Sequence, residues 1–225
     1  MTYIEFLFDI EKDLRNIWDT VNNPIKYGHD FSRNIPPSLL NVSRGKTFEE
    51  SKSELNKINS KFYKSSIIKF FVKVLNDSWS NIEGEYIKRL EKITAKPFAF
   101  EKISAFITTI QRCPYNVGEN SFMVYCFSNV FDIMRASGHE IFHLHFHKHY
   151  WHEVEKELGN QKTHELKEAL TVLLNLEFRD LWFAEDKGYE IHKELREFIR
   201  AEWNKDKNFD ILINKCMKKM KGGSK

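Results

Sequence analysis

The residues with the clearest chemical potential are His139, Glu140 and His143, which form an H-E-x-x-H sequence. Residues four apart in an α-helix lie on one face, one turn apart. If residues 139–143 are helical, both imidazoles can therefore reach one zinc ion at about 2.0–2.1 Å. Glu140 flanks the pair, where its carboxylate can take a proton from water on the metal. The spacing predicts a site for a single Zn²⁺ in the chain, with Glu140 as the general base.

A catalytic zinc site needs a third protein ligand, and two later histidines are candidates. His147 is excluded, because at about 1.5 Å per residue it lies about 12 Å along the helix from His139. His149 follows His143 at the interval of the H-E-x-x-H-x-x-G-x-x-H pattern. Phe146 occupies the glycine position of that pattern, where a bulky residue makes the required exit from the helix costly. His149 stays open as an alternative.

A carboxylate from the next helix is the other source of a third ligand. Thr163 is predicted to cap a helix that follows a Gly-Asn break and is apolar on most sides. An acid buried in such a helix needs a partner, and zinc supplies one. Glu165 falls in the first turn, where the helix dipole already stabilises an acid. Glu168 has no such explanation, so we expect Glu168 to be the third ligand, with Glu165 and His149 as alternatives.

Hydrolysis of a carbonyl compound also needs a donor that stabilises the tetrahedral oxyanion. Tyr189 is our first choice, because it follows Gly188 and lies near the start of a predicted helix, where a side chain can point into a cleft. The other candidates are His192, Tyr150, His164 and Arg112.

Helices are expected to position most of these residues. Apolar residues recur every three or four positions from Tyr3 to Val21 and predict a first helix, followed by a loop to about Leu40. Thr47 and Glu50 form a capping-box pattern that begins a second helix. Further helices are predicted over residues 66–75, 81–93, 129–147, 163–183, 188–202 and 208–220.

The pattern changes between residues 98 and 127, where β-branched and aromatic residues lean toward alternation around the break at Cys113-Pro114. This region is predicted to be a hairpin or the outer part of a small sheet. The fold class expected is therefore α+β and mainly helical. We expect a helical N-terminal region over 1–97 and a catalytic region over 98–225, together forming one compact unit.

Composition limits the classes of partner. The 225 residues carry a net charge of +3, and seven lysines against two aspartates concentrate positive charge between Trp203 and Lys225. The rest is slightly acidic, so nucleic acid is not the expected partner. No secretory signal or membrane-spanning run is visible at the sequence level. The three irregularly spaced cysteines are expected to be free thiols, which favours a cytoplasmic location.

The H-E-x-x-H segment and the downstream Glu168-Ala169-Leu170 together resemble the gluzincin metallopeptidases, the thermolysin-like group. Enzymes of that group have two histidine ligands on one helix and a glutamate on the next. The resemblance implies that His139, His143 and Glu168 bind zinc and that Glu140 is the catalytic base.

The same resemblance implies a zincin-like core, in which the β region before the motif holds an extended peptide substrate. The family has an acid shortly after the ligand glutamate that orients a ligand histidine. Thr171 and Val172 stand at that place in this chain.

Three functions are compatible with these observations. The one we expect is a zinc metallopeptidase that acts on peptides or proteins. The second is a zinc hydrolase with another substrate, because the motif defines the nucleophile and not the substrate. The third is a helical interaction module with a structural or degenerate metal site, whose basic C-terminal segment docks an acidic partner.

Overall fold

The computed structural model describes residues 3–26 and 29–222. The described chain is mainly helical with one small mixed sheet and a two-stranded ribbon, so the α+β prediction is confirmed. Two compact units are present: unit 1 comprises Met1–Trp79 and Lys102–Ile133, and unit 2 comprises Ser80–Glu101 and Met134–Lys225. The units thus interleave along the chain and do not follow the expected boundary at residue 97. No helix in the described ranges is long and apolar enough to cross a membrane.

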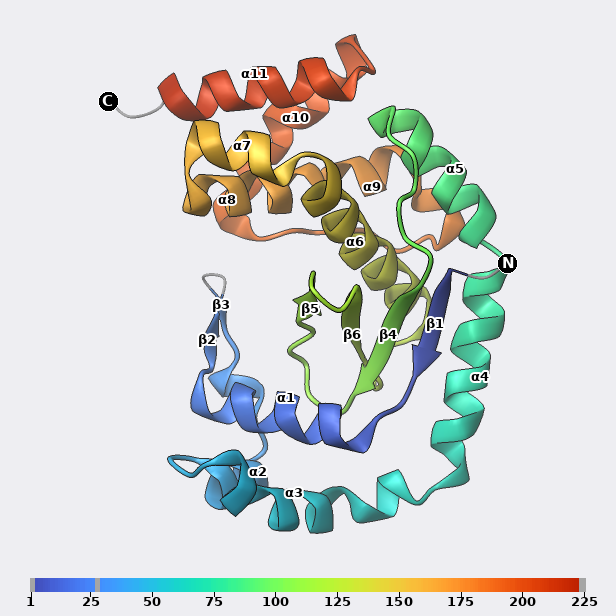
Figure 1. Ribbon diagram of the computed structural model, residues 1–225, viewed down its shortest axis with the longest axis vertical. Helices are drawn as coiled ribbons and strands as arrows, with labels where there is room; N and C mark the ends of the chain where they lie inside the picture. Colours follow the sequence, from blue (N-terminus) through green and yellow to red (C-terminus); the bar gives the residue numbers. More distant parts are fainter. Residues whose placement is uncertain (1–2, 27–28, 223–225) are drawn as a thin grey trace. The chain divides into compact units, whose positions relative to one another are not determined.

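Unit 1 contains the four-stranded sheet, whose strands are labelled in Figure 1. In spatial order the strands are β1 (Ile4–Leu7), β4 (Ile103–Thr108), β6 (Ser121–Tyr125) and β5 (Tyr115–Asn116). β4 pairs in parallel with both β1 and β6, and β5 is antiparallel to β6. Of the two structures predicted for residues 98–127, a hairpin or part of a small sheet, the sheet is confirmed, and β4 and β6 are parallel and so do not form a hairpin. The short β5 reverses the chain before β6 begins, so β6 runs in the direction of β4.

The first helix also differs from its prediction. Residues 4–7 form strand β1, and helix α1 (Ile10–Asn22) begins only after Asp9, whose side chain accepts a hydrogen bond from the Lys12 backbone N–H at 3.0 Å. Ile4 and Phe6 point inward on alternate positions and are at most 1% exposed. A four-residue apolar run fits both helical and strand spacing, and pairing with β4 makes it a strand.

Helices enclose the sheet of unit 1. The helices and strands not yet named in this unit are β2 (Ile25–Lys26), β3 (His29–Asp30), η1 (Ser32–Asn34), α2 (Pro37–Ser43), α3 (Phe48–Tyr63) and α4 (Ser66–Ser80). The predicted capping box of Thr47 and Glu50 is confirmed at the start of α3. Asn76 of α4 covers the outer edge of β1, because its side chain bonds both the N–H and the C=O of Phe6 at 3.0 Å.

Unit 2 is built from helices. They are α5 (Glu83–Thr94), α6 (Val130–His149, of which the first four residues belong to unit 1), α7 (Trp151–Leu158), α8 (Asn160–Leu170), α9 (Val172–Glu177), η2 (Arg179–Leu181), η3 (Glu190–His192), α10 (Lys193–Lys205) and α11 (Phe209–Gly222). The single helix predicted over 163–183 is therefore three shorter ones. Thr163 does not cap α8, which begins at Asn160; its hydroxyl donates instead to the Gly159 carbonyl at 2.8 Å.

Lysines of the C-terminal helix α11 form ion pairs within unit 2. Ion pairs link α11 to acids of α7 and α10, namely Lys215 with Glu202, Lys219 with Glu194 and Lys221 with Glu157. Much of the positive charge of this segment is thus neutralised within unit 2.

The three cysteines are free, as predicted.

Candidate metal centre

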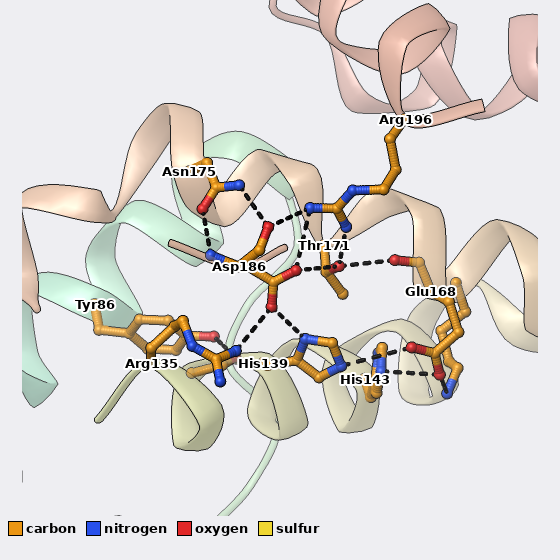
Figure 2. Close-up of polar contacts among 11 residues, drawn as sticks. Tyr86, Arg135, His139, His143, Glu168, Thr171, Asn175, Asp186 and Arg196 are labelled. Carbon is orange, nitrogen blue, oxygen red and sulfur yellow. Dashed lines mark hydrogen bonds and ion pairs between the residues drawn. The ribbon is translucent and has the colours of Figure 1, made fainter. Parts of the chain in front are cut away.

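Three donor side chains converge in unit 2, as Figure 2 shows: His139 and His143 from α6 and Glu168 from α8. One ligand atom of each lies within 4.8 Å of the other two. His139 Nε2 is 3.6 Å from Glu168 Oε2, and His143 Nε2 is 3.3 Å from Glu168 Oε1. Zinc bonds of about 2.0–2.1 Å in a tetrahedron place ligand atoms about 3.3 Å apart. Each imidazole therefore lies at about this spacing from one oxygen of the Glu168 carboxylate, and the group could hold a metal ion.

The alternative ligands have other partners. Glu165 accepts a hydrogen bond from Gln161 Nε2 at 3.0 Å, and the His149 ring nitrogen lies 3.0 Å from the Pro97 carbonyl oxygen. The structure therefore groups Glu168, and neither alternative, with the histidine pair.

A glycine allows α6 to lie close to its neighbours immediately before His139. A Cβ at Gly138 would be 2.6 Å from the Trp182 ring and 3.2 Å from the Tyr86 ring. The Tyr86 hydroxyl donates to the Gly138 carbonyl at 2.6 Å. The aromatic pair thus holds the turn of α6 that carries the first histidine.

Asp186 orients His139, and our sequence analysis missed it. Its Oδ2 lies 2.7 Å from His139 Nδ1, and Figure 2 shows the imidazole between this carboxylate and Glu168. If Nδ1 carries the proton and donates to Asp186, Nε2 keeps its lone pair for a metal. Arg135 Nη1 donates to the same Asp186 oxygen at 3.1 Å. Asp186 takes the role that the resemblance assigns to an acid near Glu168, but from a segment beyond α9.

A dense set of hydrogen bonds holds Asp186 in place. The Asn175 amide bonds both the backbone N–H and the C=O of Asp186 at 2.7 Å. Arg196 Nη2 donates to the Asp186 carboxylate at 3.1 Å, and its Nη1 donates to the Thr171 hydroxyl at 2.7 Å. Gly188, with a φ of +64°, leaves room for this arginine, because a Cβ there would lie 2.7 Å from the guanidinium carbon. The carboxylate is thereby fixed although it stands outside any helix.

Thr171 connects the hydrogen bonds around Asp186 to Glu168. Its hydroxyl lies 2.7 Å from the Glu168 carbonyl and 3.1 Å from Asp186 Oδ1. The residue that stands where the gluzincins have an acid therefore links Asp186 to the end of α8.

Charges around the site shift the pKa of both histidines, in opposite directions. Burial acts to lower the pKa of His139, but the Asp186 and Glu168 carboxylates outweigh it and raise the pKa to about 10. Burial and the Lys167 charge lower the pKa of His143 to about 3. Burial acts to raise the pKa of Glu168, which the two imidazoles and Lys167 nevertheless hold well below its usual range. The neighbouring carboxylates thus favour the protonated form of His139, whereas burial favours the neutral form of His143.

Lys167 is a second feature that our sequence analysis missed. It is fully buried, and its Nζ lies 2.9 Å from Glu168 Oε1. Lysine is rarely buried unless it is paired, and here the partner is Glu168, the carboxylate of the candidate metal site.

Glu140 has the properties of a general base. Its Oε2 is buried and has no hydrogen-bond partner among the described residues. Burial raises the pKa of Glu140 to about 7, against the lowering effect of the His139 and Lys167 charges. A buried carboxylate oxygen without a partner is costly unless a ligand or water pairs with it. Together with two imidazoles and a carboxylate at coordination spacing, this oxygen fits a zinc site.

The predicted oxyanion donors are dispersed. Tyr189 precedes η3, and its ring lies 6.1 Å from that of His192, which is buried and within the electrostatic range of Glu168. The Tyr150 hydroxyl donates to the Thr94 carbonyl at 2.6 Å. The His164 ring packs edge-on against Trp151, and Arg112 belongs to unit 1. The role of Tyr189 stays a prediction.

Comparison with known proteins identifies no relative. No protein-family model, no curated protein and no solved structure matches the chain. The resemblance to the gluzincins therefore depends on the residues of the metal centre alone.

Proposed function

We propose that the protein is a zinc-dependent hydrolase that cleaves peptide bonds. The observation that supports this most directly is the convergence of His139, His143 and Glu168. Glu140 stands on the same helix as the histidines, and its Oε2 has no hydrogen-bond partner among the residues that the structure describes. A zinc ion held by these three ligands would activate water and polarise the scissile carbonyl near neutral pH. The described residues bring three ligand side chains together, whereas a closed structural site has four protein ligands.

Residues of the protein would supply the proton transfer and the orientation of the ligand histidine. Glu140, with a pKa near 7, can accept a proton from the attacking water and then deliver it to the departing amine. Asp186 fixes the ring of His139 and favours the tautomer whose Nε2 faces the ligand group. Peptide or protein is the proposed substrate, and a cytoplasmic location stays part of the proposal.

The test combines metal analysis with hydrolysis of a peptide library. The wild-type chain should bind one zinc and cleave peptides, and a chelator should abolish cleavage. The variant Glu140→Gln should keep its zinc and lose at least about 100-fold in turnover, because general base catalysis contributes about 10²–10⁴-fold. Glu153→Gln is the matched control, since Glu153 is an exposed acid of the neighbouring helix α7.

The outcomes separate the three functions. Zinc binding with no cleavage of any peptide would favour a hydrolase with another substrate. No zinc binding at all would favour an interaction module. Full turnover by Glu140→Gln would show that Glu140 is not the base.

A further inference from the structure

Lys167 places a positive charge inside the candidate metal centre. Its side chain has no exposed surface, and its Nζ lies 2.9 Å from Glu168 Oε1. The same carboxylate oxygen lies 3.3 Å from His143 Nε2. The ammonium therefore occupies one side of the carboxylate that the candidate site offers to a metal ion.

The charge of Lys167 acts on groups of both helices that form the site. Burial lowers the pKa of His143, and the Lys167 charge lowers it further. Burial raises the pKa of Glu140, and the charges of His139 and Lys167 act against this rise. His143 and Glu140 belong to α6, whereas Lys167 and its partner Glu168 belong to α8. A charge that acts across the site in this way acts also on a metal ion bound there.

Burial keeps the charge of Lys167 near the carboxylate. Lysine side chains at a protein surface turn their charged ends toward water. Lys167 would have to disrupt the packing of α8 to do so, because it is fully buried and its neighbours Leu166 and Leu170 are fully buried too. Zinc–oxygen bonds are about 2.0–2.2 Å long, so a zinc ion on Glu168 Oε1 would lie at most about 5 Å from Nζ. The two cations would then share one carboxylate.

We propose that Lys167 is a positioning residue that holds Glu168 and competes with zinc for its carboxylate, so that zinc binds reversibly and its supply regulates the enzyme. The inference rests on the proposed function, because it takes Glu168 and the two histidines as zinc ligands. A unit charge about 5 Å from a divalent ion weakens its binding at least about tenfold even at the dielectric constant of water. The protein interior strengthens this repulsion. The chain would therefore be loaded with zinc, and active, only where free zinc is plentiful.

Competition for zinc between the full chain and a fluorescent chelator tests the proposal. Lys167→Gln removes the charge and keeps a hydrogen-bond donor for Glu168, so the Kd for zinc should fall at least about tenfold. A lysine that only supported the fold would give the opposite result, because a loosened Glu168 binds zinc more weakly. Lys156→Gln is the matched control, since Lys156 is an exposed lysine of the neighbouring helix α7. Unchanged or weaker zinc binding by folded Lys167→Gln would overturn the proposal.

The wild-type chain supplies a second test that needs no substitution. Structural zinc sites reach Kd values of about 1 pM, and the wild type should bind zinc at least about tenfold more weakly than this. Retention of zinc against a chelator with a Kd of about 1 pM would overturn the proposal even if Lys167→Gln does not fold.

The measured zinc affinities also separate this inference from the proposed function. Tighter zinc binding by Lys167→Gln, without peptide cleavage by the wild type, would refute the peptidase and support the competition. Cleavage by the wild type, with equal zinc affinity in both proteins, would refute the competition alone. Absence of zinc binding by both proteins would refute both.

Discussion

The change Asp186→Asn tests whether Asp186 controls the proton on His139. In the wild-type protein the Asp186 carboxylate lies 2.7 Å from His139 Nδ1 and contributes most to raising the pKa of that imidazole to about 10. A metal ligand must lose its proton on Nε2 before it coordinates, so zinc has to displace a proton from His139. Below pH 10, each unit by which the pH falls should weaken zinc binding about tenfold through this residue.

The size of the effect follows from the two protonation states. At pH 7.5, an imidazole with a pKa of about 10 is almost fully protonated and releases about one proton when zinc binds. The variant loses the largest of the effects that raise this pKa, so the pKa should fall toward its ordinary value of about 6.5, at which about one tenth of a proton is bound at pH 7.5. The variant should therefore release fewer protons than the wild type, by up to about 0.9.

Zinc calorimetry in two buffers with different ionisation enthalpies gives the proton count. Asp180→Asn is the control, because Asp180 is an exposed aspartate of the same unit that pairs with Arg89. Asp186 also pairs with Arg135 and Arg196, so circular dichroism must first show that the variant is folded. Equal proton release by the folded variant and the wild type would refute the coupling between Asp186 and His139. An affinity loss of about 10–100-fold, once corrected for protons, is the second expected result.

Two further predictions concern stability, measured by denaturant unfolding. Gly138→Ala should lower the free energy of unfolding by about 1–3 kcal/mol, because its Cβ would lie 2.6 Å from Trp182; Gly84→Ala, in a helix position with nothing within 4 Å, should raise it by about 0.5–1 kcal/mol. Burial lowers the pKa of His145 to about 3, below the ordinary value, so the stability it contributes is complete above about pH 6.5 and is lost as the pH falls toward 3. Between pH 7 and pH 5 this loss of stability amounts to about 2 kcal/mol. The variant His145→Gln should abolish the loss, whereas His152→Gln, a change at an exposed residue, should leave it as it is. Equal stability of the two glycine variants, or an unchanged pH dependence in His145→Gln, would contradict these accounts.

The sequence predicted helices well where the residues that indicate a helix lie close together in the chain. The Thr47–Glu50 capping box spans four residues, and its bonds form within one turn. Strand β1 could not be predicted in this way, because its partner is β4, with Ile4 opposite Ile103. The parallel direction of β4 and β6 depends on the reversal at β5, which contains only two residues. Pairing between strands that are distant in the sequence therefore determined the structure of segments whose local spacing fits more than one kind of element.

The candidate site shows the same difference between residues predicted from local spacing and residues placed by long-range contacts. His139 and His143 were predicted together because one turn of helix places them on one face. Glu168 followed from the cost of burying an acid in an apolar helix, and the structure groups it with the histidines. Asp186 could not be inferred, because it stands on an irregular segment that Asn175 and Arg196 hold in place from other parts of the chain. No pattern in the sequence indicated its proximity to His139.

The buried ammonium of Lys167 has a consequence for the candidate site before any metal is bound. Many small metal sites fold only when they are loaded, because a buried ligand carboxylate without a partner is costly until the metal arrives. Here Lys167 already neutralises Glu168 from within the same helix. The chain is therefore expected to fold before a metal is bound, and the proposed zinc would then enter a site that is already assembled.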